Sequence, residues 1–107
     1  MVAKIIAGQL GISTLALLGA SILVDLGDGL EFGIKGCRDI NLIQIILDPS
    51  DTYTVRFCRI ESVEKNTKGL PFVEVSWRLV SSHSDIYCDM LHDLIEEQTG
   101  LLTRFTN

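Results

Sequence analysis

The sequence predicts an α+β fold: a five-stranded antiparallel meander sheet with a short N-terminal helix and a C-terminal amphipathic helix packed on one face. Two patterns carry this prediction. Apolar and polar residues alternate in short segments between residues 15 and 79, as in strands with one buried face. Residues 84–99 instead repeat apolar residues every three or four positions, as in a helix lying on a core. A chain of 107 residues suits one core, so residues 1–107 are expected to form a single domain.

The N-terminal segment has features of a signal peptide or membrane span, because residues 5–24 contain no charged side chain. Glycines and polar residues interrupt this run, however, and a single lysine precedes it. We therefore expect a short helix over residues 2–10, closed by Gly11, and then a strand over about residues 15–24. On this interpretation the protein is cytoplasmic and contacts no membrane.

Four more strands are expected after a turn at Asp28-Gly29. They cover residues 30–35, 41–48, 53–58 and 71–79, and the charged stretch 61–69 is expected to be an exposed loop. The side chains expected to face the core from the last two strands are Tyr53, Val55, Phe57, Val73, Val75, Trp77 and Leu79. The opposite, open face is expected to show Glu31, Lys35, Gln44, Ile46, Thr54, Arg56, Cys58, Glu74 and Arg78.

The C-terminal helix is expected to begin at Ser84, whose hydroxyl can cap it, and to run to Thr99. Gly100 suits the left-handed conformation that ends a helix. The side chains expected on its buried face are Ile86, Tyr87, Met90, Leu91, Leu94 and Ile95. Its outer flank carries five carboxylates, which form the predicted partner-binding site: Asp85, Asp89, Asp93, Glu96 and Glu97.

The net charge of −5 is concentrated in that helix. An acidic chain is a poor electrostatic match for a phosphate backbone, so direct nucleic-acid binding is not expected. The predicted partner is a host protein with a basic surface, such as one in a nucleic-acid-binding complex. An alternative is that the open sheet face binds single strands through Lys35, Arg56 and Arg78. This alternative needs exposed aromatic rings for base stacking, and the candidate rings are all expected to be buried: Phe32, Tyr53, Phe57 and Trp77.

Catalytic and metal-binding motifs are not recognisable, so we expect no enzyme activity, no cofactor and no metal site. Cys88 and His92 lie four residues apart on the predicted helix, close enough for a thiol–imidazole contact. Nothing in the sequence supplies a third group that would orient His92, which favours an ordinary surface pair. Nor does a metal-ligand spacing join His83 to the neighbouring Asp and Cys residues. The three cysteines contain no C-x-x-C pair and are expected to be reduced thiols.

Four segments carry a family resemblance: LGA at 18–20, GLEF at 29–32, DTYTVRF at 51–57, and residues 80–101 with their IYCDML and closing TGL. Together they resemble a group of small uncharacterised proteins encoded by bacteriophages, prophages and other mobile elements. The resemblance implies a cytoplasmic protein made during infection, and it brings no active site with it. After Gly19-Ala20 the related proteins tend to be polar, whereas residues 21–24 here are apolar, which suggests a burial or oligomer contact.

Three functions follow as hypotheses. The first is a non-enzymatic, anti-CRISPR-like protein that antagonises a host defence factor by occluding its surface with the acidic helix flank. The second is a replication or recombination accessory that binds single-stranded nucleic acid on the open sheet face. The third is a virion or other structural component that self-associates, for example as a homodimer, through Ile46 or the strand at 21–24.

Overall fold

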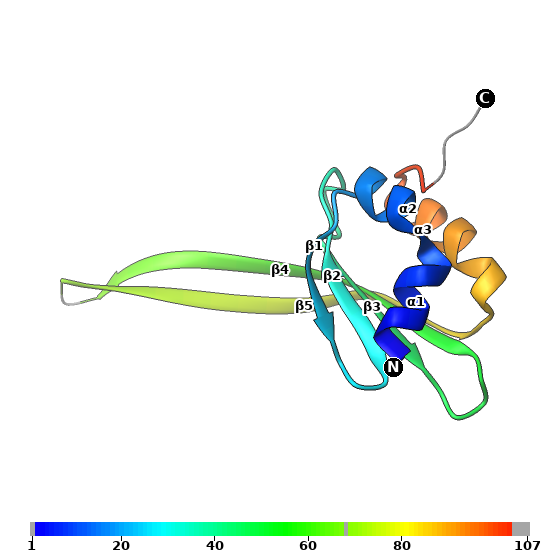
Figure 1. Ribbon diagram of the computed structural model, residues 1–107. Coiled ribbons are helices and arrows are strands. Elements are labelled where there is room, and N and C mark those ends of the chain that lie inside the picture. The colour runs from blue at the N-terminus through cyan, green and yellow to red at the C-terminus, as the bar shows by residue number, and fades with distance from the viewer. Residues whose placement is uncertain (1, 68, 104–107) are drawn as a thin grey trace.

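The computed structural model describes residues 2–67 and 69–103, without the side chains of residues 65–67 and 72. It confirms the predicted fold class, an α+β domain with a five-stranded antiparallel sheet in the order β1-β2-β3-β4-β5 (Figure 1). The elements in chain order are α1 (Val2–Leu10), α2 (Ile12–Leu17), β1 (Ser21–Asp25), β2 (Gly29–Gly33), β3 (Leu42–Leu47), β4 (Tyr53–Thr67), β5 (Leu70–Ile86), the 3₁₀ turn η1 (Cys88–Met90) and α3 (Leu91–Thr99).

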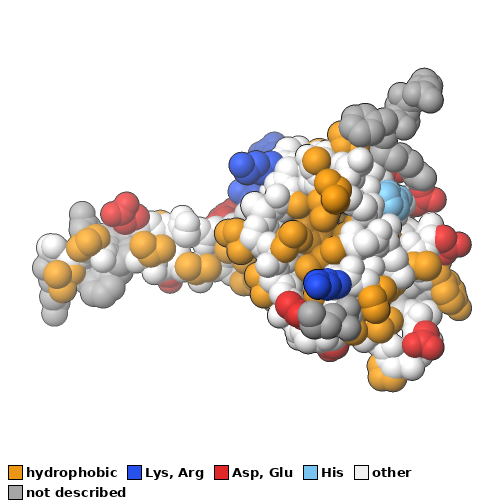
Figure 2. Space-filling model, viewed as in Figure 1, with side chains coloured by type: hydrophobic (Ala, Val, Ile, Leu, Met, Phe, Trp, Pro, Cys, Tyr) orange, Lys and Arg blue, Asp and Glu red, His pale blue; other side chains and the backbone are white. Residues whose placement is uncertain are grey.

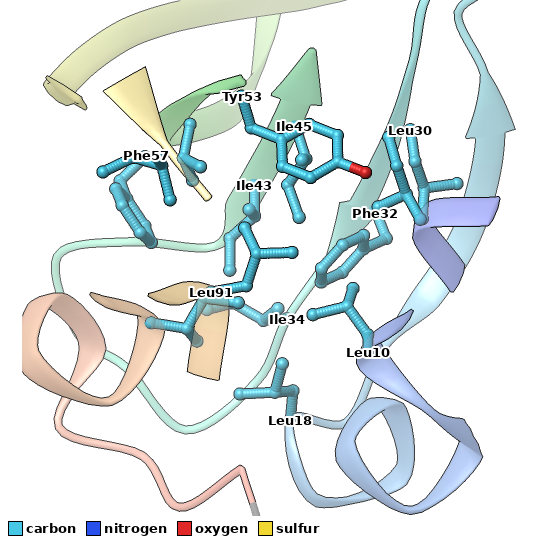
Figure 3. Packing of buried hydrophobic residues seen from close by; sticks show 14 of the residues in the cluster. Leu10, Leu18, Leu30, Phe32, Ile34, Ile43, Ile45, Tyr53, Phe57 and Leu91 are labelled. Carbon is cyan, nitrogen blue, oxygen red and sulfur yellow. The ribbon is translucent and has the colours of Figure 1, made fainter. Parts of the chain in front are cut away.

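The helices all cover one face of the sheet, and the core lies between these two layers (Figure 1). Across the sheet, Phe32 pairs with Ile43 and Ile43 with Phe57, so these three fully buried side chains form one row on the helix-covered face. Leu10 and Leu91 point into this row from α1 and α3 (Figure 3). The described side chains of the core cluster are Ala3, Ile6, Leu10, Leu18, Leu30, Phe32, Ile34, Ile40, Ile43, Ile45, Tyr53, Val55, Phe57, Ile86, Leu91 and Ile95.

The N-terminal region differs from the prediction in one place. Residues 2–10 form the expected helix, but residues 12–17 form the second helix α2 and the strand begins only at Ser21. The burial pattern fits a helix: Thr14 and Leu18 are buried, whereas Ala16 between them is exposed, and a strand would place all three on one face. No helix in the described part of the chain is long and apolar enough to cross a bilayer.

The C-terminal helix is shorter than predicted. Residues 84–86 belong to β5, where Ile86 pairs with Tyr53, so Ser84 lies in a strand and caps no helix. Helix α3 begins at Leu91, and Gly100 ends it in the predicted left-handed conformation, with φ 72°. Leu91 and Ile95 are buried as predicted. Tyr87 and Met90, also predicted to be buried, are 59% and 42% exposed, because they precede the helix and do not share its apolar stripe.

The largest difference concerns residues 61–67 of the predicted loop 61–69, which form a strand instead; Lys68 lies outside the described residues. Strand β4 continues to Thr67 and pairs with β5 from Glu61↔Ser76 to Thr67↔Leu70. These residues form a two-stranded arm, defined here as residues 59–67 of β4 and 70–79 of β5, which projects far from the helices (Figure 1). The molecule is therefore elongated: it extends 52 Å along its longest axis, and its radius of gyration is 15.3 Å, against about 13 Å for a compact domain of this length.

A β-bulge at the base of the arm decides which side chains the arm presents. Phe57 pairs with Ser81 and Cys58 with Leu79, so Val80 is an extra residue on β5 without a register partner. The extra residue inverts the alternation of β5 beyond it. As a result Leu79 does not lie on the helix-covered face but on the same face as Cys58 and Ile60. The same holds for every second residue of β5 from Leu79 towards the tip. The four side chains predicted to be buried in this strand are therefore exposed instead: Val73, Val75, Trp77 and Leu79.

Candidate interaction surface on the β4–β5 arm

The arm has one apolar face and one polar face, because directly paired residues in an antiparallel ladder project to the same side. The apolar face consists of Ile60, Val73, Val75, Trp77 and Leu79, with Ser62 and Glu64 beside them on β4. Val73 is 67% exposed, Val75 63% and Trp77 52%. Hydrophobic side chains recur along the projecting arm (Figure 2). Apolar side chains in this number are normally buried, so the arm carries an unusual surface.

The polar face carries charges of both signs. Arg59 lies directly opposite Arg78, and Glu61 is paired with Ser76. The Arg59 Nε atom lies 3.4 Å from Glu61 Oε1, which offsets the repulsion between the two guanidinium groups. These four side chains line a shallow hollow of about 140 Å³. Val63 and Leu70, on the same face, are 51% and 59% exposed, and Val63 is paired with Glu74, so the described side chains of this face form no continuous stripe like that opposite.

Asn41 fixes the base of the arm to the body. Its Nδ2 donates to the Ile60 carbonyl at 2.7 Å, and its Oδ1 accepts from the Ile60 amide at 2.8 Å. The side chain thereby extends the β3–β4 ladder beyond the end of β3. Both backbone groups of a residue in an antiparallel strand point to the same side, so those of Ile60 face Asn41 and not β5. Ile60 and Trp77 therefore form a non-hydrogen-bonded pair, the kind in which side chains approach most closely.

Cys58 lies at the junction of arm and body. Its side chain is fully buried although it projects from the open face, and Leu42 and Leu79 are its register partners on either side. Burial raises the pKa of the Cys58 thiol above its ordinary value. The prediction that Cys58 is exposed on the open face is therefore wrong, and the apolar face of the arm continues into the body.

The predicted acidic site is distributed over three elements and is not the flank of one helix. Asp85 lies in β5, Asp89 in η1, and the remaining three carboxylates in α3. Glu96 is half-buried and accepts a hydrogen bond from the Thr103 amide at 3.0 Å. The side chains of Asp85, Asp89, Asp93 and Glu97 are exposed, so part of the predicted acidic surface remains.

The structure does not bring together the residues of the alternative nucleic-acid face. Arg56 is exposed on the open face of the sheet, whereas Arg78 lies on the polar face of the arm. Lys35 is in the loop after β2, where its amide donates to the Leu18 carbonyl. The expectation that Glu74 and Arg78 share the open face with Arg56 is wrong, because the bulge at Val80 places them on the other side.

His83, Cys88 and His92 are the candidate residues for metal or thiol–imidazole chemistry. No group of three or more His, Cys, Asp or Glu within them could hold a metal ion. His92 Nδ1 lies 3.0 Å from the hydroxyl of Thr103. The hydrogen-bond partner of His92 in the described part of the chain is therefore Thr103 and not Cys88. The ring of His83 packs edge-on against Phe57, with ring centroids 5.8 Å apart.

A second apolar area lies at the β1 edge of the sheet. A hollow of about 250 Å³ separates α1 from this edge and is lined by Ala3, Lys4, Ala7, Leu23, Asp25 and Leu30. Ile22 is 83% exposed here, at a positive φ of 51°. The strand at 21–24, predicted as an oligomer contact, is thus exposed at an edge, whereas Ile46, the other predicted contact, is half-buried.

No protein-family model, curated protein or solved structure matches this chain. The resemblance to small phage-encoded proteins therefore stays a prediction.

Proposed function

We propose that the protein is a non-enzymatic, self-associating protein, and that the apolar face of its arm pairs with the same face of a second copy. The exposed stripe of four large apolar side chains on a projecting hairpin carries the proposal. A two-stranded hairpin is marginally stable alone in water, and packing against a further layer is what usually stabilises it. A second arm supplies such a layer with matching chemistry.

The exposed area supports a second copy as the occupant. The four β5 side chains of the apolar face leave on the order of 400 Å² of apolar surface in water per copy. Association through this surface and its polar border approaches the roughly 800 Å² per partner of a standard interface. Burial of the apolar part from both copies supplies the favourable term that offsets the lost freedom of motion and the desolvation of polar groups on association.

Charge supports a second copy over nucleic acid. Two described charged side chains border the apolar stripe, Glu64 towards the tip and Arg56 towards the body, so this surface lacks the excess of Lys and Arg that binds a phosphate backbone. Among the described side chains of the apolar face Trp77 is the one aromatic ring, which falls short of the successive aromatic residues on which bases stack. Single-strand binding is therefore not the function that this surface favours.

Oligomeric state tests the proposal, and the arm offers a matched pair of variants. Val75 and Val63 are both exposed valines in the arm, but Val75 lies on the apolar face and Val63 on the polar face. We expect sedimentation velocity to show a dimer for the unaltered protein, a monomer for Val75→Lys, and a dimer for Val63→Lys. A monomeric unaltered protein at all concentrations, or equal effects of the two substitutions, would refute the proposal.

Inhibition of a host factor through the acidic surface remains a second candidate, supported by the exposure of Asp89, Asp93 and Glu97. These residues occur at a spacing of four along η1 and α3, which directs them to one side of the helical layer. Charge reversal at Asp89 and Asp93 is expected to abolish capture of a basic host protein from a lysate, with the dimer intact. Retention of every captured protein after both reversals would rule this candidate out.

A further inference from the structure

We infer that the two arms pair antiparallel, about a twofold axis at the Ile60–Trp77 row, and that Glu64 of each copy then faces Arg56 of the other. This inference rests on the proposed self-association and specifies its geometry. It assigns to Arg56 and Glu64 a role in orienting the two copies.

The Ile60–Trp77 row is the middle one of the five rows on this side of β4 and β5 that run from Arg56–Ser82 near the body to Glu64–Val73 towards the tip. The next rows along the arm are Leu79 with Cys58 on the body side and Val75 with Ser62 on the tip side. A twofold axis in the interface, perpendicular to the strands, places Trp77 against Trp77 of the second copy and Val75 against Leu79 of the second copy. Apolar side chains thus meet apolar side chains at the three central rows of the β5 half, and Val73 lies against Ser82 of the second copy at the outer rows.

The charges at the two ends of the face are complementary under the same axis. Arg56 and Glu64 lie on the same strand and project to the same side, four residues before and four residues after Ile60. Each is thus about 13 Å from the axis, at about 3.3 Å per residue. Rotation about the axis carries Glu64 onto the position of Arg56, so the dimer contains two such pairs.

Orientation follows from the signs of these charges. A parallel twofold arrangement that covers both strands would place β4 of each copy over β5 of the other, so Glu64 would face Val73 and Arg56 would face Ser82, with no opposite-charge pair. The antiparallel arrangement instead forms two opposite-charge pairs, one at each end of the face. Arg56 and its register partner Ser82 are both exposed, so the open face at this row can receive the tip region of the partner's arm.

A charge swap tests the inference. Glu64→Arg alone and Arg56→Glu alone each convert both attractive pairs into like-charge pairs, and we expect each to raise the dimer Kd by about tenfold or more at low salt. The double variant restores opposite charges and is expected to return the Kd to within about threefold of the unaltered protein. Glu61→Arg, on the polar face of the same strand, is the control and is expected to change the Kd by less than about threefold.

The outcomes separate this inference from the proposed function. Recovery in the double variant supports the antiparallel arrangement. If the unaltered protein is a dimer but the single variants dimerise normally, or the double variant stays as weak as the single ones, the arrangement is overturned while self-association stands. If the unaltered protein is a monomer throughout, both are overturned.

Discussion

Replacing Asn41 by alanine should loosen the base of the arm without disturbing the core. The substitution removes both hydrogen bonds between the Asn41 side chain and Ile60, at 2.7 and 2.8 Å. It leaves the Ile60 amide and carbonyl, which point away from β5, without these partners. The Asn41 backbone amide keeps its own bond to the Cys58 carbonyl at 3.0 Å, so the end of β3 should stay in place.

The magnitude follows from the two lost bonds. A hydrogen bond contributes about 0.5–1.5 kcal/mol, and a part-buried group left unpaired adds to the cost. We expect the free energy of unfolding to fall by about 2 kcal/mol, which corresponds to a Tm lower by roughly 10 °C for a domain of this size. Exchange of the Ile60 amide with solvent should accelerate by about 30-fold, the equivalent of the same free energy.

Hydrogen exchange measured by NMR, with urea denaturation in parallel, checks this expectation. Gln44→Ala is the matched control, because Gln44 also lies beside β4 but bonds to Glu31 at 2.8 Å and not to Ile60. The control should leave exchange at Ile60 within about threefold of the unaltered protein. Equal exchange rates at Ile60 in Asn41→Ala and in the unaltered protein would show that Asn41 does not hold the arm.

Three further results are expected. Burial raises the pKa of Tyr53 above its ordinary 10.0 and that of Cys58 above its ordinary 9.0. Both groups lose their protons more easily in the unfolded chain, so the free energy of unfolding should fall as pH rises through these ordinary values. Tyr53→Phe should reduce the fall measured in alkaline urea titrations. Under native conditions a thiol reagent should label the exposed Cys88 first and Cys58 only on unfolding; rapid labelling of both would contradict the described burial. Thr14→Val should cost about 1–3 kcal/mol in thermal unfolding, because it removes the buried 2.6 Å bond to the Thr103 carbonyl; an unchanged Tm would show that this bond is dispensable.

The sheet and its order were predictable because the central strands carry a strict alternation. Phe32, Ile43 and Phe57 occur at positions of one parity within their strands, and the structure buries all three in one row. The end of the C-terminal helix at Gly100 was also predictable, since a helix often ends at a residue that tolerates positive φ. The residues at 12–17 were not, because a short apolar run suits a helix and a strand alike.

The surface of the arm could not be predicted, because alternation indicates a two-sided strand but not which side meets the core. Val75 and Trp77 alternate with polar residues as buried strand residues do. A single extra residue, Val80, sends them to the opposite face. Gly69, which has a φ of 76°, is the residue that could have indicated a hairpin turn. The charged residues before it are typical of an exposed loop, so a strand was not predicted there.

The fluorescence of Trp77 tests the central claim most directly, because it is the only tryptophan in the chain and lies on the apolar face between Leu79 and Val75. Pairing of two arms predicts a blue-shifted emission at high protein concentration that moves to longer wavelength on dilution, with the same midpoint as the dimer–monomer transition in sedimentation. An emission maximum typical of a water-exposed indole at every concentration would contradict the pairing of the arms.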